Sequence, residues 1–247
     1  MTEKPNFVLV PYREPTPPRP PGLLTRLRTL LARLGNRPLA QRDTEAPPSG
    51  RPRLVFGFDA TASREPAWAT ARQVTDALVR TLPNELDVAL AVHGGSHLHT
   101  FTEFTADPNR LRDRAAGIAC RAGMTRLLPI LRRSLASPGV RVVIYIGDVF
   151  EESPTRGRTL ADEMGRRGMR LIVLHDTADW MARRDAELFL DLARRTGGCV
   201  LPFDANAPDR LREILGAAAA YAVGGTTLLR QRHDAGALLL LQRLPDE

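Results

Sequence analysis

The chain has 247 residues, 43% hydrophobic and 26% charged, which is enough apolar sequence for a full hydrophobic core. Its net charge of +7 is concentrated in the first 53 residues, which hold ten basic and four acidic residues, so the remainder carries only +1. This balance argues against nucleic acid as a partner of the folded part. Two cysteines without a CxxC pair, and no apolar run of membrane-spanning length, predict a cytoplasmic protein with no membrane span.

Residues 1–52 are predicted to be an N-terminal extension. The proline-rich stretch VPYREPTPPRPPG is expected to be extended. Residues 22–35, approximately, place leucines at helical spacing with arginines off that stripe, which predicts a short basic amphipathic helix followed by a linker. Such a helix either docks on a partner or an acidic membrane surface, or packs back on the domain or frays. The sequence leaves these alternatives open.

Residues 53–222 alternate between short apolar runs and helical segments. Strands are predicted at 53–58, 86–94, 97–104, 140–147, 170–175 and 199–203. Helices are predicted at 66–82, 108–120, 126–135, 155–167, 181–196 and 208–221. This alternation predicts a doubly wound α/β sheet, in which the second and third strands form an antiparallel hairpin at one edge. Residues 223–247 form a C-terminal extension whose stretch GALLLLQRL is either a last helix on the domain or an interaction segment.

Five oxygen-bearing side chains follow strands or lie on loops of this predicted sheet. Asp59 ends the first strand, and Thr61 and Ser63 follow it on the loop to the next helix. Thr125 lies on a glycine-preceded loop, and Asp148 ends the most apolar strand. In doubly wound sheets, ligands bind beyond the carboxyl ends of strands where the strand order reverses. Because hard oxygen atoms are the ligands that Mg²⁺ prefers, the five residues are candidates for one metal site.

The pattern D-x-T-x-S, then Thr, then Asp, resembles the von Willebrand factor A (vWA) domain and its metal-ion-dependent adhesion site (MIDAS), of the intracellular bacterial type. The usual pattern begins D-x-S-x-S, and Thr61 keeps the hydroxyl of the first Ser. The resemblance covers roughly residues 53–222. It implies a six-stranded, mostly parallel sheet of order 3-2-1-4-5-6, with one antiparallel edge strand and helices on both faces.

The resemblance also implies a function. Thr61 and Ser63 would bind Mg²⁺ or Mn²⁺ directly, Asp59 and Asp148 would act largely through ordered water, and Thr125 would join or leave the shell. An acidic residue of a protein partner would complete the coordination. The protein is thus expected to be a non-enzymatic adaptor or assembly component, and relatives that work beside ATPases or chaperones suggest a partner of that kind.

Two alternatives use the same sequence differently. Phosphohydrolases of the haloacid dehalogenase type also begin with a strand that ends in D-x-[DT]-x-[TS], which would make Asp59 a nucleophile toward phosphate beside Mg²⁺. Their second Asp is replaced by Thr61, and the only lysine of the chain, Lys4, lies in the N-terminal extension. The other alternative is a metal-free scaffold that acts through the N-terminal helix.

The residues that follow Asp59 also have an ordinary structural interpretation. Ser63 is expected to cap a helix that begins at Glu65 or Pro66, alone or in addition to binding a metal. Arg64 is expected to pair with Glu65, although it could instead contact an incoming acid.

Two further groups of polar residues lie near the predicted site. Glu151 and Glu152 are interpreted as acids at the start of the following helix, in preference to residues that rim the site. His93, His97 and His99 are close enough in sequence for zinc, but no cysteine or carboxylate nearby completes a set, and ordinary hairpin histidines are expected.

Overall fold

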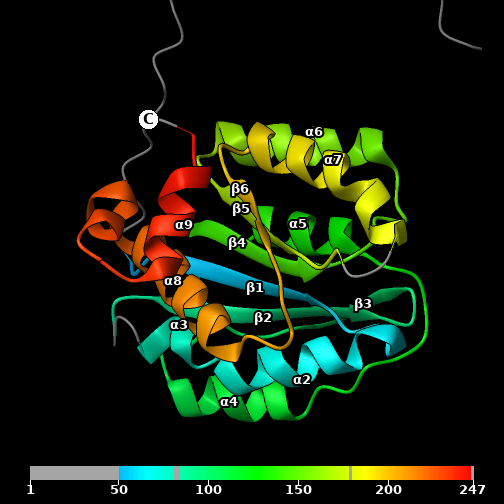
Figure 1. The fold of residues 1–247 in the computed structure, drawn as a ribbon, viewed down its shortest axis with the longest axis horizontal. Helices are drawn as coiled ribbons and strands as arrows, with labels where there is room; N and C mark the ends of the chain where they lie inside the picture. Colours follow the sequence, from blue (N-terminus) through cyan, green and yellow to red (C-terminus); the bar gives the residue numbers. More distant parts are fainter. Residues whose placement is uncertain (1–49, 81–83, 178–179, 246–247) are drawn as a thin grey trace, which may run out of the picture. The chain divides into compact units, whose positions relative to one another are not determined.

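The central feature of the protein, seen in a computed structural model that describes residues 50–80, 84–177 and 180–245, is a six-stranded sheet. Its strands are β1 (Arg53–Asp59), β2 (Asp87–Gly94), β3 (His97–Phe101), β4 (Val140–Gly147), β5 (Arg170–His175) and β6 (Cys199–Pro202). Their order is β3-β2-β1-β4-β5-β6, and only β2 and β3 pair in the antiparallel sense. The predicted order and hairpin are therefore confirmed (Figure 1). The predicted N-terminal helix lies outside the described residues.

Helices cover both faces of the sheet (Figure 1). One core joins the sheet to α2 (Glu65–Val74), α3 (Ala77–Arg80), α4 (Pro108–Ala116), α8 (Pro208–Arg230) and α9 (Ala235–Arg243). The other core joins it to α5 (Leu127–Leu135), α6 (Pro154–Arg166) and α7 (Trp180–Arg195). Since both faces are covered, the central strands are continuous apolar runs.

The first strand shows how the two cores divide its side chains. Leu54, Phe56 and Phe58 lie in the core of α2 and α8, whereas Val55 lies in the core of α5. Side chains alternate between the two faces of a strand, so Asp59 falls on the same face as Val55. Every residue from Leu54 to Asp59 is buried. The strand therefore carries its terminal acid into the interior.

The first two predicted helices differ from those observed. The first breaks at Thr75, between α2 and α3, where the Thr75 hydroxyl donates to the Ala71 carbonyl oxygen at 2.8 Å. The helix predicted to reach residue 120 ends at Ala116 instead, with Gly117 as its C-cap. The chain from there to α5 is irregular, and it includes Thr125.

The last long helix, α8, continues beyond the predicted end at residue 221. It bends at Gly224 and Gly225, and Gly225 has a φ of 62°, which glycine adopts without strain. Its second part and α9 bury Leu229 and Leu240 in the same core as α8, so the apolar C-terminal stretch is a helix that packs on the domain. Within the described ranges, no helix has the length and apolar character needed to cross a membrane.

Candidate functional site

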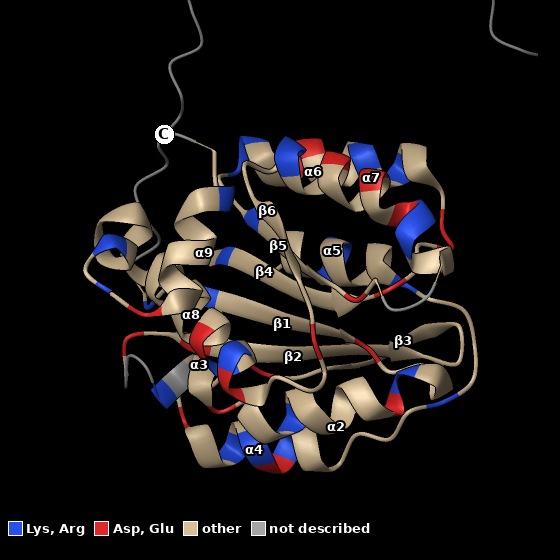
Figure 2. Cartoon of the chain, viewed as in Figure 1, with Lys and Arg blue, Asp and Glu red and all other residues tan. Residues whose placement is uncertain are grey.

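A pocket of about 620 Å³ opens at the carboxyl ends of the parallel strands, where the strand order reverses between β1 and β4. Thr61, Ser63, Thr125 and Asp148 all line this pocket. Asp59 is fully buried and is attached to the pocket wall through a hydrogen bond to the backbone of Thr61. The structure thus brings the five predicted residues to one end of the sheet. Figure 2 shows acidic residues on the loops at this end of the sheet, while the outer helices carry both arginines and acids.

The loop after β1 is held by the Asp59 carboxylate. Its Oδ1 accepts a hydrogen bond from the Thr61 backbone N–H at 3.0 Å. The hydroxyl oxygens of Thr61 and Ser63 lie 3.4 Å apart. The other carboxylate oxygen, Asp59 Oδ2, is buried and has no hydrogen-bond partner among the described residues. An unpartnered buried oxygen costs free energy, so this atom is suited to a ligand that the protein itself does not supply.

Ser63 does not cap the helix, and this prediction is wrong. A short 3₁₀ turn, η1 (Ala62–Arg64), follows the Asp59 loop and makes Arg64 the residue that precedes α2. No side chain caps α2. The extra turn moves Ser63 one residue away from the capping position and leaves its hydroxyl on the pocket wall.

The environment of Asp59 favours its protonated form. Burial, and then repulsion from the Asp148 carboxylate, raise the pKa of Asp59 to about 7. Its hydrogen bonds with Thr61 act in the opposite direction. A cation close to the carboxylate would favour the ionised form. The Arg64 charge already lowers this pKa, so Asp59 regains its ordinary acidity only if further positive charge is brought close to it.

His93, a buried residue near the end of β2, connects the strands to the loops of the site by hydrogen bonds. Its Nδ1 accepts from the Arg126 backbone N–H at 3.3 Å, and its Nε2 lies 2.8 Å from the Tyr145 hydroxyl. Burial lowers the pKa of His93 to about 3, so the ring is neutral and its 3.7 Å approach to Asp59 is no ion pair. With Nδ1 as acceptor, the proton lies on Nε2. The ring thereby ties β2 and β4 to the loop that carries Thr125.

The three histidines do not form one group. His93 is buried, whereas His97 and His99 lie on β3 with ring centroids 4.3 Å apart. In the part of the chain that the structure describes, no three His, Cys, Asp or Glu side chains gather as a metal-binding cluster. The structural role of His93 was not predicted from the sequence.

Glu151 holds the Thr125 loop through a reciprocal pair of hydrogen bonds. The Thr125 backbone N–H donates to Glu151 Oε2 at 2.7 Å, and the Glu151 backbone N–H donates to Thr125 Oγ1 at 3.1 Å. Glu152 Oε2 accepts from the Leu128 backbone N–H at 2.7 Å and so caps α5. The sequence predicts that both acids lie at the start of α6, but the residue that caps α6 is Ser153. That prediction is wrong, because both side chains turn back toward the preceding loop.

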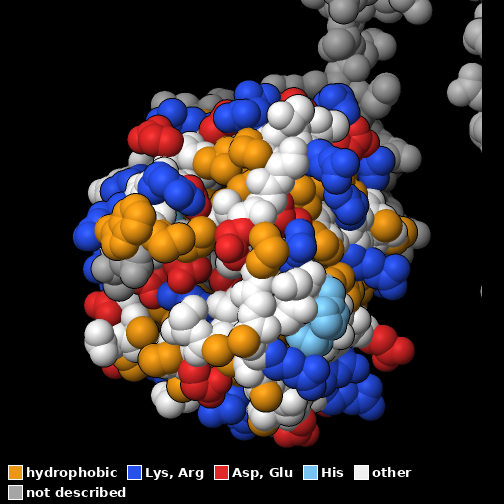
Figure 3. Space-filling model, turned by 90° about the vertical axis from the view of Figure 1, so that its right-hand side faces the viewer, with side chains coloured by type: hydrophobic (Ala, Val, Ile, Leu, Met, Phe, Trp, Pro, Cys, Tyr) orange, Lys and Arg blue, Asp and Glu red, His pale blue; other side chains and the backbone are white. Residues whose placement is uncertain are grey.

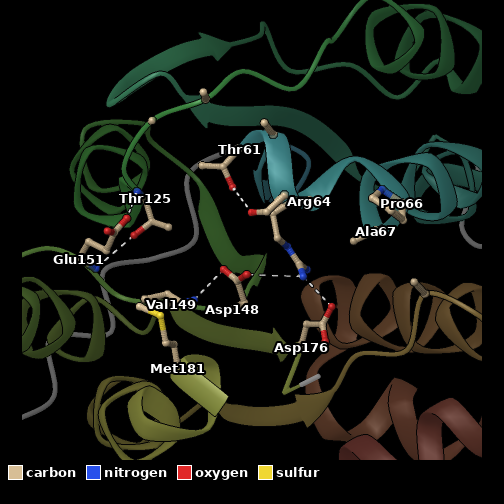
Figure 4. Close-up of a pocket in the computed structure, with 15 residues that line it drawn as sticks. Thr61, Arg64, Pro66, Ala67, Thr125, Asp148, Val149, Glu151, Asp176 and Met181 are labelled. Carbon is tan, nitrogen blue, oxygen red and sulfur yellow. Dashed lines mark hydrogen bonds and ion pairs between the residues drawn. The ribbon is translucent and has the colours of Figure 1, made fainter. Parts of the chain in front are cut away.

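Arg64 points into the pocket. The predicted pair between Arg64 and Glu65 is wrong. Its Nη1 lies 2.6 Å from Asp176 Oδ2 and 3.8 Å from Asp148 Oδ2 (Figure 4). Asp148 is in turn held by the Val149 backbone N–H, which donates to its Oδ1 at 2.7 Å. Asp176 directly follows β5 and lines the pocket, yet it was not among the predicted residues. Its position after an apolar strand was the signal that would have found it.

These side chains fit a divalent cation of the Mg²⁺ type. The predicted set supplies only oxygen ligands, two hydroxyls lie next to each other, and Asp59 Oδ2 lacks a partner within the described part of the chain. The feature that departs from a simple cation site is the Arg64 guanidinium, which already supplies positive charge beside Asp148.

Comparison with known proteins gives a clear result only for structure. No protein-family model and no curated protein matches the chain in sequence. A von Willebrand factor type A structure from Catenulispora acidiphila is similar at 16% identity and a TM-score of 0.57, over 71% of this chain and 43% of that one. The VWA domain of SpRpn10 is similar at 13% identity and a TM-score of 0.50, over 66% of this chain and 95% of that one.

A third similar structure contains a metal. Proximal thread matrix protein 1 from the mussel byssus, with a zinc-occupied MIDAS motif, is 13% identical with a TM-score of 0.54, over 69% of this chain and 46% of that one. This chain therefore spans less than half of that protein and of the Catenulispora acidiphila protein. At these identities the similarity is one of fold. The protein has the von Willebrand factor A fold, as the resemblance in sequence implied.

Proposed function

We propose that the protein is a metal-dependent protein interaction module, with Mg²⁺ or Mn²⁺ held at the pocket by a MIDAS-type set of residues. Thr61 and Ser63 bind the ion directly, Asp59 and Asp148 act largely through water, and Thr125 is the adjustable member. An acidic side chain of a partner completes the coordination. The observation that carries this proposal is the buried, unpartnered oxygen of Asp59, whose other oxygen holds the loop on which the neighbouring hydroxyls of Thr61 and Ser63 line an open pocket. The zinc-occupied MIDAS of proximal thread matrix protein 1 supports a divalent ion.

The burial of Asp59 supports a binding function over phosphate hydrolysis. A nucleophilic carboxylate must reach its substrate, but Asp59 is 0% exposed and is not among the residues that line the pocket. Thr61 cannot act as the general acid that the missing second Asp would provide. We therefore propose a non-enzymatic adaptor or assembly component. We also propose that it acts in the cytoplasm beside an ATPase or a chaperone, in keeping with its two free cysteines.

Large apolar side chains beside the pocket extend the proposed binding face. Met124 is 43% exposed, Trp180 is 65% exposed and Met181 is 39% exposed. Met181 lines the pocket, Trp180 precedes it, and Met124 lies between the lining residues Gly123 and Thr125. Figure 3 shows acidic side chains in the middle of this face with hydrophobic ones around them. Exposed Trp and Met side chains favour protein contacts, so we propose that the partner's acid is flanked by an apolar residue.

The proposed ion site is tested by titration of the full chain with Mn²⁺ in a calorimeter. Ser63→Ala removes one hydroxyl and is expected to weaken Mn²⁺ binding at least about tenfold, or about 1.4 kcal/mol. Ser137→Ala is the matched control, because Ser137 lies before β4, at the opposite end of that strand from the pocket. Equal Mn²⁺ affinity in the wild type and Ser63→Ala would overturn the proposed site.

Trp180→Ala tests the apolar part of the binding face. The probe is a peptide array in which a single Asp or Glu is flanked by Leu or Phe, read with and without EDTA. Truncation of an exposed aromatic anchor is expected to reduce capture by about 30-fold, or about 2 kcal/mol. Leu238→Ala is the matched control, because Leu238 is 54% exposed on α9 and does not line the pocket. If the two variants capture peptides equally well, Trp180 is not part of the binding face.

A further inference from the structure

The pocket contains a positive charge of its own. Arg64 is 5% exposed, and among the described residues it is the only basic side chain that lines the pocket. Its guanidinium lies between two carboxylates from different strand ends, those of Asp148 after β4 and Asp176 after β5 (Figure 4). The Arg64 Cζ atom also lies over the Phe203 ring, 5.8 Å from the ring centroid. A cation is thus built into the end of the sheet where the metal is proposed to bind.

The guanidinium is only partly committed to these contacts. Arg64 Nη1 makes the ion pairs, whereas Nε and Nη2 are buried without hydrogen-bond partners among the described residues. An arginine offers five N–H donors, and leaving buried ones unused is costly. The position of Arg64 is therefore explained by the charge of the carboxylates around it rather than by a complete set of hydrogen bonds.

The two ion pairs of Arg64 differ in length, and the pair with Asp176 is the shorter one. Arg64 Nη1 is 2.6 Å from Asp176 but 3.8 Å from Asp148. A hydrogen-bonded contact with one carboxylate restrains the guanidinium from closing on the other. The Asp148 carboxylate is therefore attracted by the positive charge of Arg64 but accepts no hydrogen bond from it.

We propose that Arg64 and Asp176 set the affinity of the pocket for divalent cations. Arg64 competes with the ion because two positive groups cannot approach Asp148 together without repulsion. Asp176 is a positioning residue, which draws the guanidinium away from Asp148 and so leaves room for the ion. This inference rests on the proposed function, since it concerns the same pocket and the same class of ligand.

The test is a double-mutant cycle in which Mn²⁺ affinity is measured by calorimetry on the full chain. Arg64→Gln removes the competing charge and is expected to tighten Mn²⁺ binding at least tenfold. Asp176→Asn lets the guanidinium close on Asp148 and is expected to weaken binding at least tenfold. The double variant is expected to bind Mn²⁺ as tightly as Arg64→Gln alone, because removal of Arg64 leaves Asp176 nothing to position, whereas additive effects of the two changes would show that Asp176 acts independently of Arg64. Arg64→Lys retains the positive charge, so its Mn²⁺ affinity is expected to be close to that of the wild type and weaker than that of Arg64→Gln.

Controls separate this inference from changes in net charge and from failure of the site itself. Arg72→Gln on α2 and Asp113→Asn on α4 make the same charge changes at residues that do not line the pocket. Circular dichroism confirms that each variant is folded before titration. If Ser63→Ala weakens binding but Arg64→Gln does not tighten it, the inference is wrong and the site stands. If neither the wild type nor any variant binds Mn²⁺, both the proposed ion site and this inference are wrong. Binding of Mn²⁺ by Arg64→Gln but not by the wild type would directly support competition between Arg64 and the ion.

Discussion

Asp59→Asn is expected to make the metal-free protein more stable at pH 8, by about 2 to 4 kcal/mol. The folded-state pKa of Asp59 is raised from 3.8 to about 7, so the folded protein retains a proton that the unfolded chain has lost. The wild type is therefore expected to lose free energy of unfolding as the pH rises from about 4 to about 7, with no further loss from this group above that range. Asn carries no charge at any of these pH values, so the variant avoids the cost of ionisation.

Urea unfolding in EDTA at pH 5 and pH 8 measures this effect. The stability difference between Asp59→Asn and the wild type is expected to be less than half as large at pH 5 as at pH 8, because pH 5 lies within the range over which the wild type loses stability. Asp113→Asn, an exposed carboxylate on α4, controls for the general loss of one charge. Saturating Mn²⁺ is expected to stabilise the wild type and not the variant, since a ligand that binds only the folded state shifts the equilibrium toward it. A pH-independent difference between the two proteins would contradict the raised pKa.

Trp68→Ala is expected to reduce the free energy of unfolding by about 3 to 5 kcal/mol, as for other fully buried large residues. Trp68 is 1% exposed, and its ring centroid lies 4.6 Å from that of Phe58. Its Nε1–H donates to the Ile118 carbonyl oxygen at 3.2 Å. The indole thus joins α2, which follows the proposed metal-binding loop, to β1 and to the segment after α4.

Trp68→Phe separates the two contributions of this residue. The smaller ring retains much of the contact with Phe58 but loses the hydrogen bond to Ile118, so a loss of about 1 to 2 kcal/mol is expected. Urea denaturation followed by far-ultraviolet circular dichroism gives both values. The sequence contains two tryptophans, so emission from Trp180 remains to report on the pocket mouth in either variant. Equal losses in Trp68→Ala and Trp68→Phe would show that packing at this position is unimportant.

The sheet was predictable because its strands obey a local rule. Runs such as VRVVIYIG are buried on both faces, and they alternate with helices of sufficient length to cross back over the sheet. The strand order is not a local property, and it came from the resemblance to vWA domains. The helix ends were less predictable. The Thr75 hydroxyl bonds back to the preceding turn at the break between α2 and α3, but the Thr159 hydroxyl makes the same kind of bond inside the uninterrupted α6.

The candidate site was predictable to a different extent. Four of its five proposed ligands end or follow β1 or β4, and Thr125 lies on the loop before α5. The structure places all five at one pocket or directly against it. The contacts of Arg64, Glu151 and Glu152 were not predictable, because each joins loops that are at least 24 residues apart in sequence. Sequence spacing favoured local partners, such as Glu65 for Arg64, whereas the burial of opposite charges at the sheet end favoured distant ones.

The two edges of the sheet have a consequence for how the protein avoids unwanted association. β6 has only four residues, ends at Pro202, which has no backbone N–H to donate, and packs against α9. β3, at the other edge, has five residues, and its pairing with β2 shifts register between Val92 and His93. Short, covered or irregular edges are poor templates for the addition of another strand. Both margins of the sheet are therefore poor sites for edge-to-edge aggregation, which leaves the pocket end as the surface that we propose for a protein partner.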